Sequence, residues 1–151
     1  MRHRISAGVL VEIDGRILLV RHQKPGKYDF WVAPGGGAEE GEDLHATARR
    51  EVLEECGLHI EPLKIAYVEE FANPHTRECK VWFTGRLLRG TLSSSAPAAV
   101  RVHIVEAVWL FRSELDGKTV FPPMLRSEYW RDKEEGFAYP RYVGLREMEF
   151  Y

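Results

Sequence analysis

The sequence predicts an α/β fold in which strands flank one amphipathic helix. Aliphatic segments of strand length recur along the chain and are separated by turn residues such as Asp14-Gly15. Residues 44–56 instead carry apolar side chains four positions apart, as on the buried face of a helix. This order of elements is compatible with helices packed on a sheet. The expected strands cover residues 5–13, 16–20, 28–34, 63–71, 80–88 and 102–111.

Composition indicates an ordinary soluble globular protein. The chain has 151 residues, enough for about one domain, and we expect a single domain over residues 1–151. Hydrophobic residues make up 44% and charged residues 29%, with a net charge of -2, which argues against disorder and against a polycationic nucleic-acid binder. Cys56 and Cys79 form no disulfide framework, and we expect both to be reduced. No apolar run approaches the length of a membrane span and residues 1–4 lead into a strand, so a cytoplasmic location is expected.

The N-terminal third predicts a hairpin followed by a basic loop. Asp14-Gly15 is a strong turn signal between the first two strands. Residues 21–27 are basic and rich in turn formers, which favours a loop at the end of a strand. In the next strand, alternation places the rings of Phe30 and Trp31 on opposite faces, one in the core and one near a cleft. The sequence does not say which ring is which.

A glycine-rich turn leads into an acidic helix. Glu51, Glu54 and Glu55 fall within an arc of about 100° on the helix surface, so three carboxylates share one face. Like charges repel, by about 4 kcal/mol at 4 Å in a cleft of effective dielectric near 20. A divalent cation would turn this repulsion into attraction, and oxygen ligands suit Mg2+ or Mn2+. The alternative is a solvated acidic helix face.

The remaining helix positions have structural explanations. Leu44, Ala48, Val52 and Cys56 form the apolar stripe. Gly57 is the expected C-cap in the left-handed conformation. Glu42 and Asp43, the acidic residues at the helix start, would complement the helix dipole.

Residues 36–58 resemble the Nudix box at every position. Gly36, Glu42, Arg50-Glu51, Val52, Glu54-Glu55 and Gly57-Leu58 stand at the spacing of that motif. The preceding Trp31-Val32-Ala33-Pro34-Gly35 looks like the strand and turn before the box. The resemblance implies a Nudix α/β/α sandwich, a mixed sheet with the box helix on one face and a C-terminal helix on the other. It also implies an Mg2+-dependent pyrophosphohydrolase, with Mn2+ as a substitute, that acts on a small nucleotide and forms a homodimer in many members.

The resemblance also assigns roles within the box. Glu51, Glu54, Glu55 and the carbonyl oxygen of Gly35 would bind the metal, while one carboxylate of the set acts as the base. Glu42 would pair with Arg50 and brace the loop against the helix. The backbone at Gly36 and Gly37 would lie close to a phosphate, because glycine permits such an approach.

Residues outside the box complete the candidate site. Arg21 and His22 would face substrate phosphates, with ordinary strand-end solvation as the alternative. Glu106, in the Glu-x-x-Trp sequence that ends at Trp109, is the first candidate for an additional carboxylate or base. Glu69 and Glu70 are the next candidates, since strand alternation turns one of them to each face.

Later segments are less informative. Residues 63–71 and 80–88 should form a second hairpin, and residues 90–99 should form a mobile loop, which lacks the carboxylate that many Nudix proteins have there. Residues 122–131 should form a helix, and residues 139–151 have no decisive period. The C-terminal aromatic residues fit core closure or a subunit contact better than a base-stacking platform. These are Tyr129, Trp130, Phe137, Tyr139 and Tyr142.

The expected function is hydrolysis of a pyrophosphate linkage in a nucleoside diphosphate derivative. Nucleotide sugars, ADP-ribose, dinucleoside polyphosphates and nucleoside triphosphates, including oxidised ones, all remain open as substrates. The alternative is a non-catalytic Nudix-like module that binds a nucleotide or a partner protein, although such a module has no need of three carboxylates. A third reading, decapping of RNA 5′ ends, has little support from the near-neutral net charge.

Overall fold

A computed structural model of the protein describes residues 1–148, in which nine strands form one curled mixed sheet. The strands are β1 (Arg2–Ile13), β2 (Arg16–Lys24), β3 (Tyr28–Val32), β4 (Gly35–Gly37), β5 (Leu58–Ala72), β6 (Thr76–Gly90), β7 (Ile104–Phe111), β8 (Val120–Phe121) and β9 (Arg141–Glu147). The helices are α1 (Leu44–Cys56), α2 (Pro97–Arg101) and α3 (Tyr129–Glu134), with 3-10 turns η1 (Arg112–Leu115) and η2 (Pro123–Arg126). The strand order is β8-β3-β2-β1-β6-β5-β9, with β4 on β1 and β7 on β2. The predicted mixed sheet between helices is therefore confirmed.

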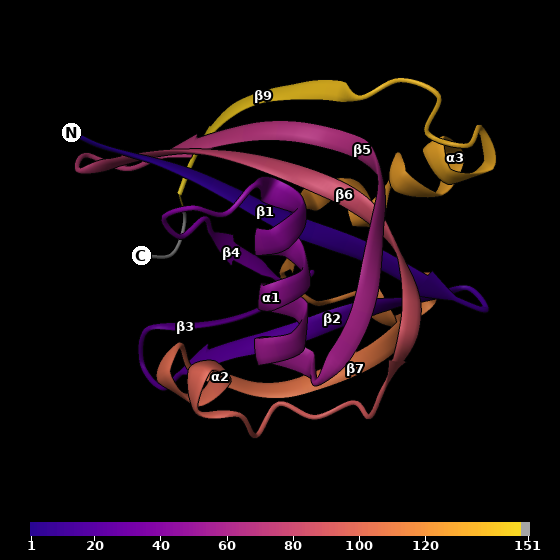
Figure 1. The fold of residues 1–151 in the computed structure, drawn as a ribbon, viewed down its shortest axis with the longest axis horizontal. Helices are drawn as coiled ribbons and strands as arrows, with labels where there is room; N and C mark the ends of the chain where they lie inside the picture. The colour runs from indigo at the N-terminus through magenta and orange to yellow at the C-terminus, as the bar shows by residue number, and fades with distance from the viewer. Residues whose placement is uncertain (149–151) are drawn as a thin grey trace.

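Strand β1 joins the two halves of the sheet. Most of β1 pairs in parallel with β6, from Arg2 opposite Thr76 to Val11 opposite Gly85. Only the last two residues of β1 pair with β2. The predicted Asp14-Gly15 turn is present, with positive φ at both residues. The halves consequently diverge, with β5, β6 and β9 on one side and β2, β3 and β7 on the other, and α1 lies between them (Figure 1).

Helix α1 begins and ends as its sequence predicts. The Asp43 side chain accepts a hydrogen bond from the Ala46 N–H at 2.8 Å, which satisfies one of the free donors of the first turn. At the other end, Gly57 has φ 72° and donates its N–H to the Leu53 carbonyl. The cap residues therefore fix which side chains α1 turns toward the sheet.

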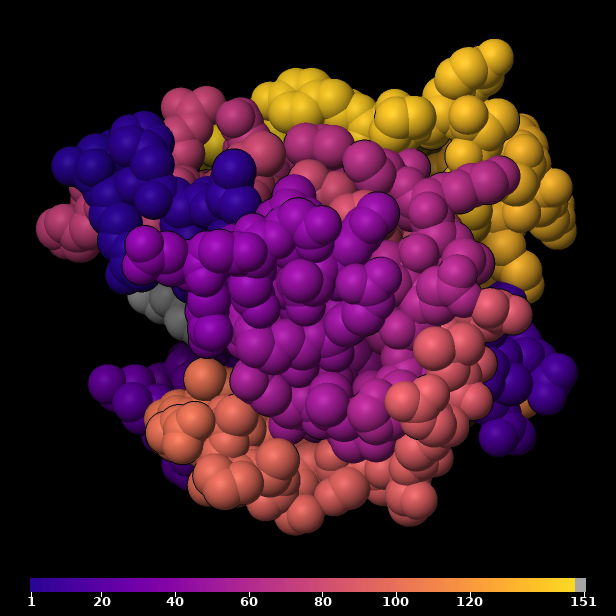
Figure 2. Space-filling view, in the orientation of Figure 1, coloured from indigo at the N-terminus to yellow at the C-terminus, as the bar shows by residue number. Residues whose placement is uncertain are grey.

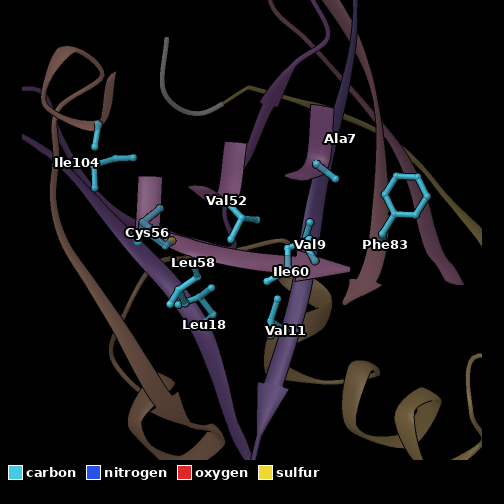
Figure 3. Packing of buried hydrophobic residues seen from close by; sticks show 13 residues of the cluster. Ala7, Val9, Val11, Leu18, Val52, Cys56, Leu58, Ile60, Phe83 and Ile104 are labelled. Carbon is cyan, nitrogen blue, oxygen red and sulfur yellow. The ribbon is translucent and has the colours of Figure 1, made fainter. Parts of the chain in front are cut away.

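The predicted apolar stripe of α1 is buried against the sheet. Ala48, Val52 and Cys56 are fully buried with residues of β1, β2 and β5. In Figure 3, Val52 and Cys56 point toward Val9 and Leu18. Because this stripe faces the sheet core, the carboxylates of Glu51 and Glu55 lie on another side of the helix, near the glycine turn.

A second core covers the opposite face of the sheet. Leu10, Trp82 and Tyr67 pack there against Leu125 and Tyr129 from the C-terminal segments. The predicted helix over residues 122–131 is wrong in its bounds, since Pro123–Arg126 is a 3-10 turn and α3 starts only at Tyr129. Proline at the start of the turn and the non-helical Ser127 separate the two.

The C-terminal aromatic residues divide into two groups. Tyr129 is buried and contacts the rings of Trp130 and Phe137, which fits the predicted core closure. Tyr139 and Tyr142 are instead 82% and 65% exposed. Core closure thus applies to the first three residues of the set, and a subunit contact stays a prediction for the other two.

Two expected loops, and the C-terminal segment without a decisive period, contain regular structure. Residues 21–24 are not a loop, because they continue β2 and pair with both β3 and β7. Residues 90–99 include the start of α2, where Pro97 takes a first-turn position and Ala99 is buried beside α1. Part of residues 139–151 forms β9, which pairs in parallel with β5, and residues 149–151 lie outside the described part.

The surface of α1 is closely surrounded by neighbouring segments. In the space-filling view, its violet surface meets the orange segment that contains α2 without an open gap (Figure 2).

No helix among residues 1–148 combines the length and apolar character needed to cross a bilayer. The cytoplasmic location stays a prediction.

Substitution at the α1 cap should cost more than substitution at a free turn. Gly57→Ala should lower the free energy of unfolding by clearly more than 1 kcal/mol, because alanine disfavours positive φ by about 1 kcal/mol and its Cβ would also lie 2.6 Å from the Thr91 carbonyl oxygen. Gly26→Ala is the matched control, with φ +75° and no atom within 4 Å of the added Cβ. Urea unfolding of both variants measures the difference, and equal losses would contradict the close packing of this cap.

Candidate functional site

A cavity of about 500 Å³ opens between the two halves of the sheet, beside α1. One wall is formed by the backbone of Gly35 and Gly36 with the carboxylates of Glu51 and Glu55. The facing wall comes from β5 and β6 and carries both acidic and basic side chains. These are Glu69, Glu78 and Lys80, with Arg2, Arg4 and Arg146 from neighbouring strands. The cavity therefore combines a metal-type carboxylate set with cations suited to an anion.

The aromatic lining lies next to these charged groups. Tyr28, Phe30, Phe71 and Phe121 all border the cavity. The open question about β3 is thereby answered, because Phe30 faces the cavity and Trp31 packs in the second core. Aromatic faces beside charged groups fit a ligand with a flat ring and an anionic part.

Glu55 is the most deeply placed carboxylate of α1. It is 4% exposed and accepts the Gly35 N–H at 2.8 Å. Burial, reinforced by the neighbouring charge of Glu51, raises its pKa well above the usual range. A buried carboxylate next to a second carboxylate lacks a sufficient positive counter-charge, and a bound cation would supply that charge.

Glu51 reaches the glycine turn at very short range. A Cβ added at Gly36 would lie 2.5 Å from the Glu51 carboxylate carbon, so a side chain there would displace this carboxylate. Burial raises the pKa of Glu51, and the guanidinium of Arg50 opposes that rise. Glycine at position 36 thus allows the Glu51 carboxylate to lie against the backbone of the turn.

Arg50 connects the turn to the helix. Its Nε donates to Glu42 at 2.7 Å, and a terminal nitrogen donates to the Gly37 carbonyl at 2.9 Å. The other terminal nitrogen donates to Glu51 at 2.8 Å and to Glu54 at 3.2 Å. The Arg50 hydrogen bond lowers the pKa of Glu42 to about 2. The brace between Glu42 and Arg50 that the resemblance implies is therefore present.

The three α1 carboxylates share one side of the helix but do not converge on a common point. Glu51 and Glu55 line the cavity, whereas Glu54 does not and its side chain is 37% exposed. No group of three His, Cys, Asp or Glu side chains within residues 1–148 is arranged to hold a metal ion. Arg50 donates to one oxygen of Glu51 and one oxygen of Glu54, which leaves the second oxygen of each carboxylate for another partner.

Arg21 does not reach the cavity. Its guanidinium donates to both carboxylate oxygens of Asp29, at 2.8 and 2.7 Å, and lies 3.9 Å from Glu106. This corrects the expected phosphate contact, because Arg21 reaches Asp29, its diagonal neighbour on β3, in place of the cavity. Gly37 likewise is absent from the described lining of the cavity, although its carbonyl binds Arg50.

His22 lines the cavity but carries no charge near neutral pH. Its ring stacks on Phe30 with a centroid distance of 5.0 Å, and Nδ1 lies 3.1 Å from the Val102 carbonyl oxygen. Burial lowers the pKa of His22 to about 4. In this environment the neutral imidazole offers a hydrogen bond and no charge, and a contact of His22 with a substrate phosphate stays a prediction.

The additional carboxylates are placed differently from the first expectation. Glu106 pairs across strands with Arg21 and is not among the described cavity-lining residues. Glu69 lines the cavity and is 3% exposed, with its oxygens on the Trp82 indole N–H at 2.9 Å and near Arg146. Glu70 turns to the other face and binds Arg77 and Tyr142, as strand alternation predicts.

The sequence reading overlooked the contribution of β6. Glu78, Lys80 and Trp82 alternate along this strand and all face the cavity. Glu78 is buried and accepts a hydrogen bond from the Ser6 hydroxyl, with 2.6 Å between the two oxygens. The spacing of Glu78 and Lys80, two positions apart in one strand, was the available signal, because alternation turns both side chains to the same face.

Comparisons with known proteins identify the same motif and fold. A family model described as NUDIX domain matches residues 1–127. The chain is 39% identical over 102 residues to the RNA pyrophosphohydrolase of Caulobacter vibrioides, which covers 58% of this chain and 59% of that protein. It is 44% identical over 57 residues to nucleoside diphosphate-linked moiety X motif 6 of Xenopus laevis, which covers 38% of this chain and 26% of that protein. The chain thus spans 26% and 59% of the lengths of these two relatives.

A solved structure matches nearly the whole chain. The NUDIX hydrolase from Nitrosomonas europaea superposes with a TM-score of 0.75 at 23% identity, over 92% of this chain and 93% of that one. At this identity the likeness concerns the fold. The sequence match and the structural match thus point to the same fold.

Acidification should reveal the buried state of His22. Its folded pKa of about 4 lies below the ordinary 6.5, so the unfolded chain takes up the proton first as pH falls. Stability should therefore fall between about pH 6.5 and pH 4, by up to about 3 kcal/mol at 1.36 kcal/mol per pKa unit. His22→Asn should remove this part of the pH dependence, as measured by urea unfolding at each pH.

His75, which is exposed, supplies the control. His75→Asn should keep the full pH dependence of the parent protein, because its side chain lies at the surface. An unchanged pH profile for His22→Asn would contradict a neutral, buried imidazole.

Proposed function

The chain belongs to the NUDIX family, and from this membership and the cavity we propose that it is a divalent-metal-dependent hydrolase of a phosphoanhydride in a nucleoside diphosphate derivative. The observation that carries the proposal is the pair of carboxylates, Glu51 and Glu55, in one cavity beside the Gly35-Gly36 backbone. Residues 1–151 would act as one domain.

The donor set fits a hard divalent cation. We propose that Glu51, Glu54, Glu55 and the Gly35 carbonyl hold Mg2+, for which Mn2+ can substitute, since these oxygen ligands suit both ions. The raised pKa of buried Glu55 supports this, because its charge lacks a full counter-charge. When bound, the metal would neutralise phosphate charge and make a water molecule more acidic.

The chain's own residues would orient the substrate and handle the proton. A carboxylate of the α1 set would accept the proton of the attacking water, a role that the position of Glu106 outside the cavity does not favour. Arg50 would hold the turn and the helix in register through Glu42 and Gly37. Phe30, Phe71 and Phe121 would contact the nucleoside and exclude water from its ring.

The name of the Caulobacter relative favours a second candidate substrate, a pyrophosphate group on RNA. Arg2, Arg4 and Arg146 line the cavity and would contact such an anion. The net charge of -2 speaks against a long basic track for a strand. An RNA substrate in the assay panel, with release of pyrophosphate or phosphate as readout, separates the candidates.

Neutralising the cavity carboxylates should remove activity without unfolding the protein. Glu51→Gln and Glu55→Gln should each lower kcat by about a thousandfold, because each removes a ligand and a negative charge from the metal site. The thermal unfolding midpoint should be unchanged or higher for Glu55→Gln, because this substitution removes a buried charge that Glu51 repels. Glu134→Gln, at an exposed position of α3, should retain the parent rate.

A substrate panel with Mg2+ provides the rates. It contains ADP-ribose, nucleotide sugars, dinucleoside polyphosphates, nucleoside triphosphates with oxidised forms, and RNA bearing a 5′ triphosphate, and products are identified by chromatography. Removing the metal with a chelator should stop every reaction, and adding Mg2+ or Mn2+ should restore it. Binding of a nucleotide without turnover, in a folded and metal-loaded protein, would favour the non-catalytic module instead.

A further inference from the structure

Lys80 places a buried ammonium in the cavity. Its side chain projects from β6 on the same face as Glu78 and Trp82, and the residue is only 8% exposed. Within residues 1–148 the ammonium makes no hydrogen bond and no direct salt bridge, and it lies 4.3 Å from the centroid of the Trp82 ring. This largely buried charge has no direct ion pair and borders the cavity, which favours an anionic ligand there.

The nearest carboxylates are already engaged by other donors. Glu55, Glu69 and Glu78 all act electrostatically on Lys80. Glu55 accepts the Gly35 N–H, Glu69 accepts the Trp82 indole N–H, and Glu78 accepts the Ser6 hydroxyl hydrogen. These carboxylates attract the ammonium without holding it, which leaves its donors directed to the cavity.

The ammonium is held in place by its contact with Trp82. That indole is 1% exposed, and its N–H lies 2.9 Å from a Glu69 oxygen. It also lies so close to β1 that a Cβ added at Gly8 would come within 2.2 Å of the ring. Because the ring has no free space, the cation above it is positioned before any ligand arrives.

We infer that Lys80 is a substrate-binding residue whose ammonium pairs with a non-bridging phosphate oxygen of a diphosphate, opposite the metal-binding carboxylates of α1. The inference rests on the proposed function, since it names the group that the cavity binds. The two walls would then hold one diphosphate from both sides, with the metal at Glu51 and Glu55 and the cation on β6. An ammonium suits this role as a compact charge with three donors.

Binding of a non-hydrolysable diphosphate tests this directly. Methylenediphosphonate is titrated calorimetrically into the Mg2+-loaded protein. Lys80→Met, which keeps the length of the side chain and removes the charge, should weaken binding by about tenfold or more, as loss of a charge-assisted hydrogen bond predicts. Lys80→Arg should recover part of the affinity. Lys27→Met, at an exposed turn, should stay within about twofold of the parent protein.

Two further measurements separate ligand binding from a structural role. Mg2+ titrated alone should bind Lys80→Met no more weakly than the parent protein, because the substitution removes a positive charge near the carboxylates. In the unmodified protein, acetylation of Lys80 by an amine-reactive reagent, followed by mass spectrometry, should slow when methylenediphosphonate is present, while Lys27 reacts at the same rate. This second measurement needs no variant to fold.

The outcomes distinguish this inference from the proposed function. Methylenediphosphonate affinity within twofold of the parent in a folded Lys80→Met protein, or unaltered acetylation at saturating probe, overturns the role of Lys80 even if nucleotides are hydrolysed. Conversely, Lys80-dependent probe binding without hydrolysis of any panel substrate supports the inference and rejects the proposed reaction.

Discussion

The cavity depends on the set of hydrogen bonds made by Arg50. One guanidinium binds Glu42 before the helix, the Gly37 carbonyl in the turn, and Glu51 and Glu54 on the helix itself. A planar group with five donors can satisfy partners in several directions at once, which a lysine cannot do. The turn and α1 are thereby fixed to each other, and the Glu51 carboxylate is held against the glycine backbone.

The sequence could predict features that depend on neighbours a few positions away. The Asp14-Gly15 hairpin, the caps of α1 at Asp43 and Gly57, and the buried stripe all follow from local spacing. The shared face of Glu51 and Glu55 and their place beside the glycine turn have the same origin. One wall of the cavity was therefore predictable from residues 35–58 together with the family resemblance.

The other wall depends on contacts between distant parts of the chain. Lys80 and Glu78 reach the cavity because β6 pairs with β1, which local pattern does not encode. The loss of charge at His22 depends on burial against Phe30 and Val102. Arg21 binds Asp29, its diagonal neighbour on the adjacent strand, and Arg141–Glu147 lacked a decisive period because none of its residues is fully buried. Tertiary context decided each of these features.

The pairing of β1 with β6 also constrains biosynthesis. Ser6 and Glu78 touch although 72 residues separate them, and parallel strands this far apart form slowly because a long loop must close first. While the ribosome is still making β6, the synthesised chain already contains α1 with its clustered acidic groups. Translation arrested before β6 is complete would yield a segment that has the motif but lacks the wall formed by Glu78 and Lys80.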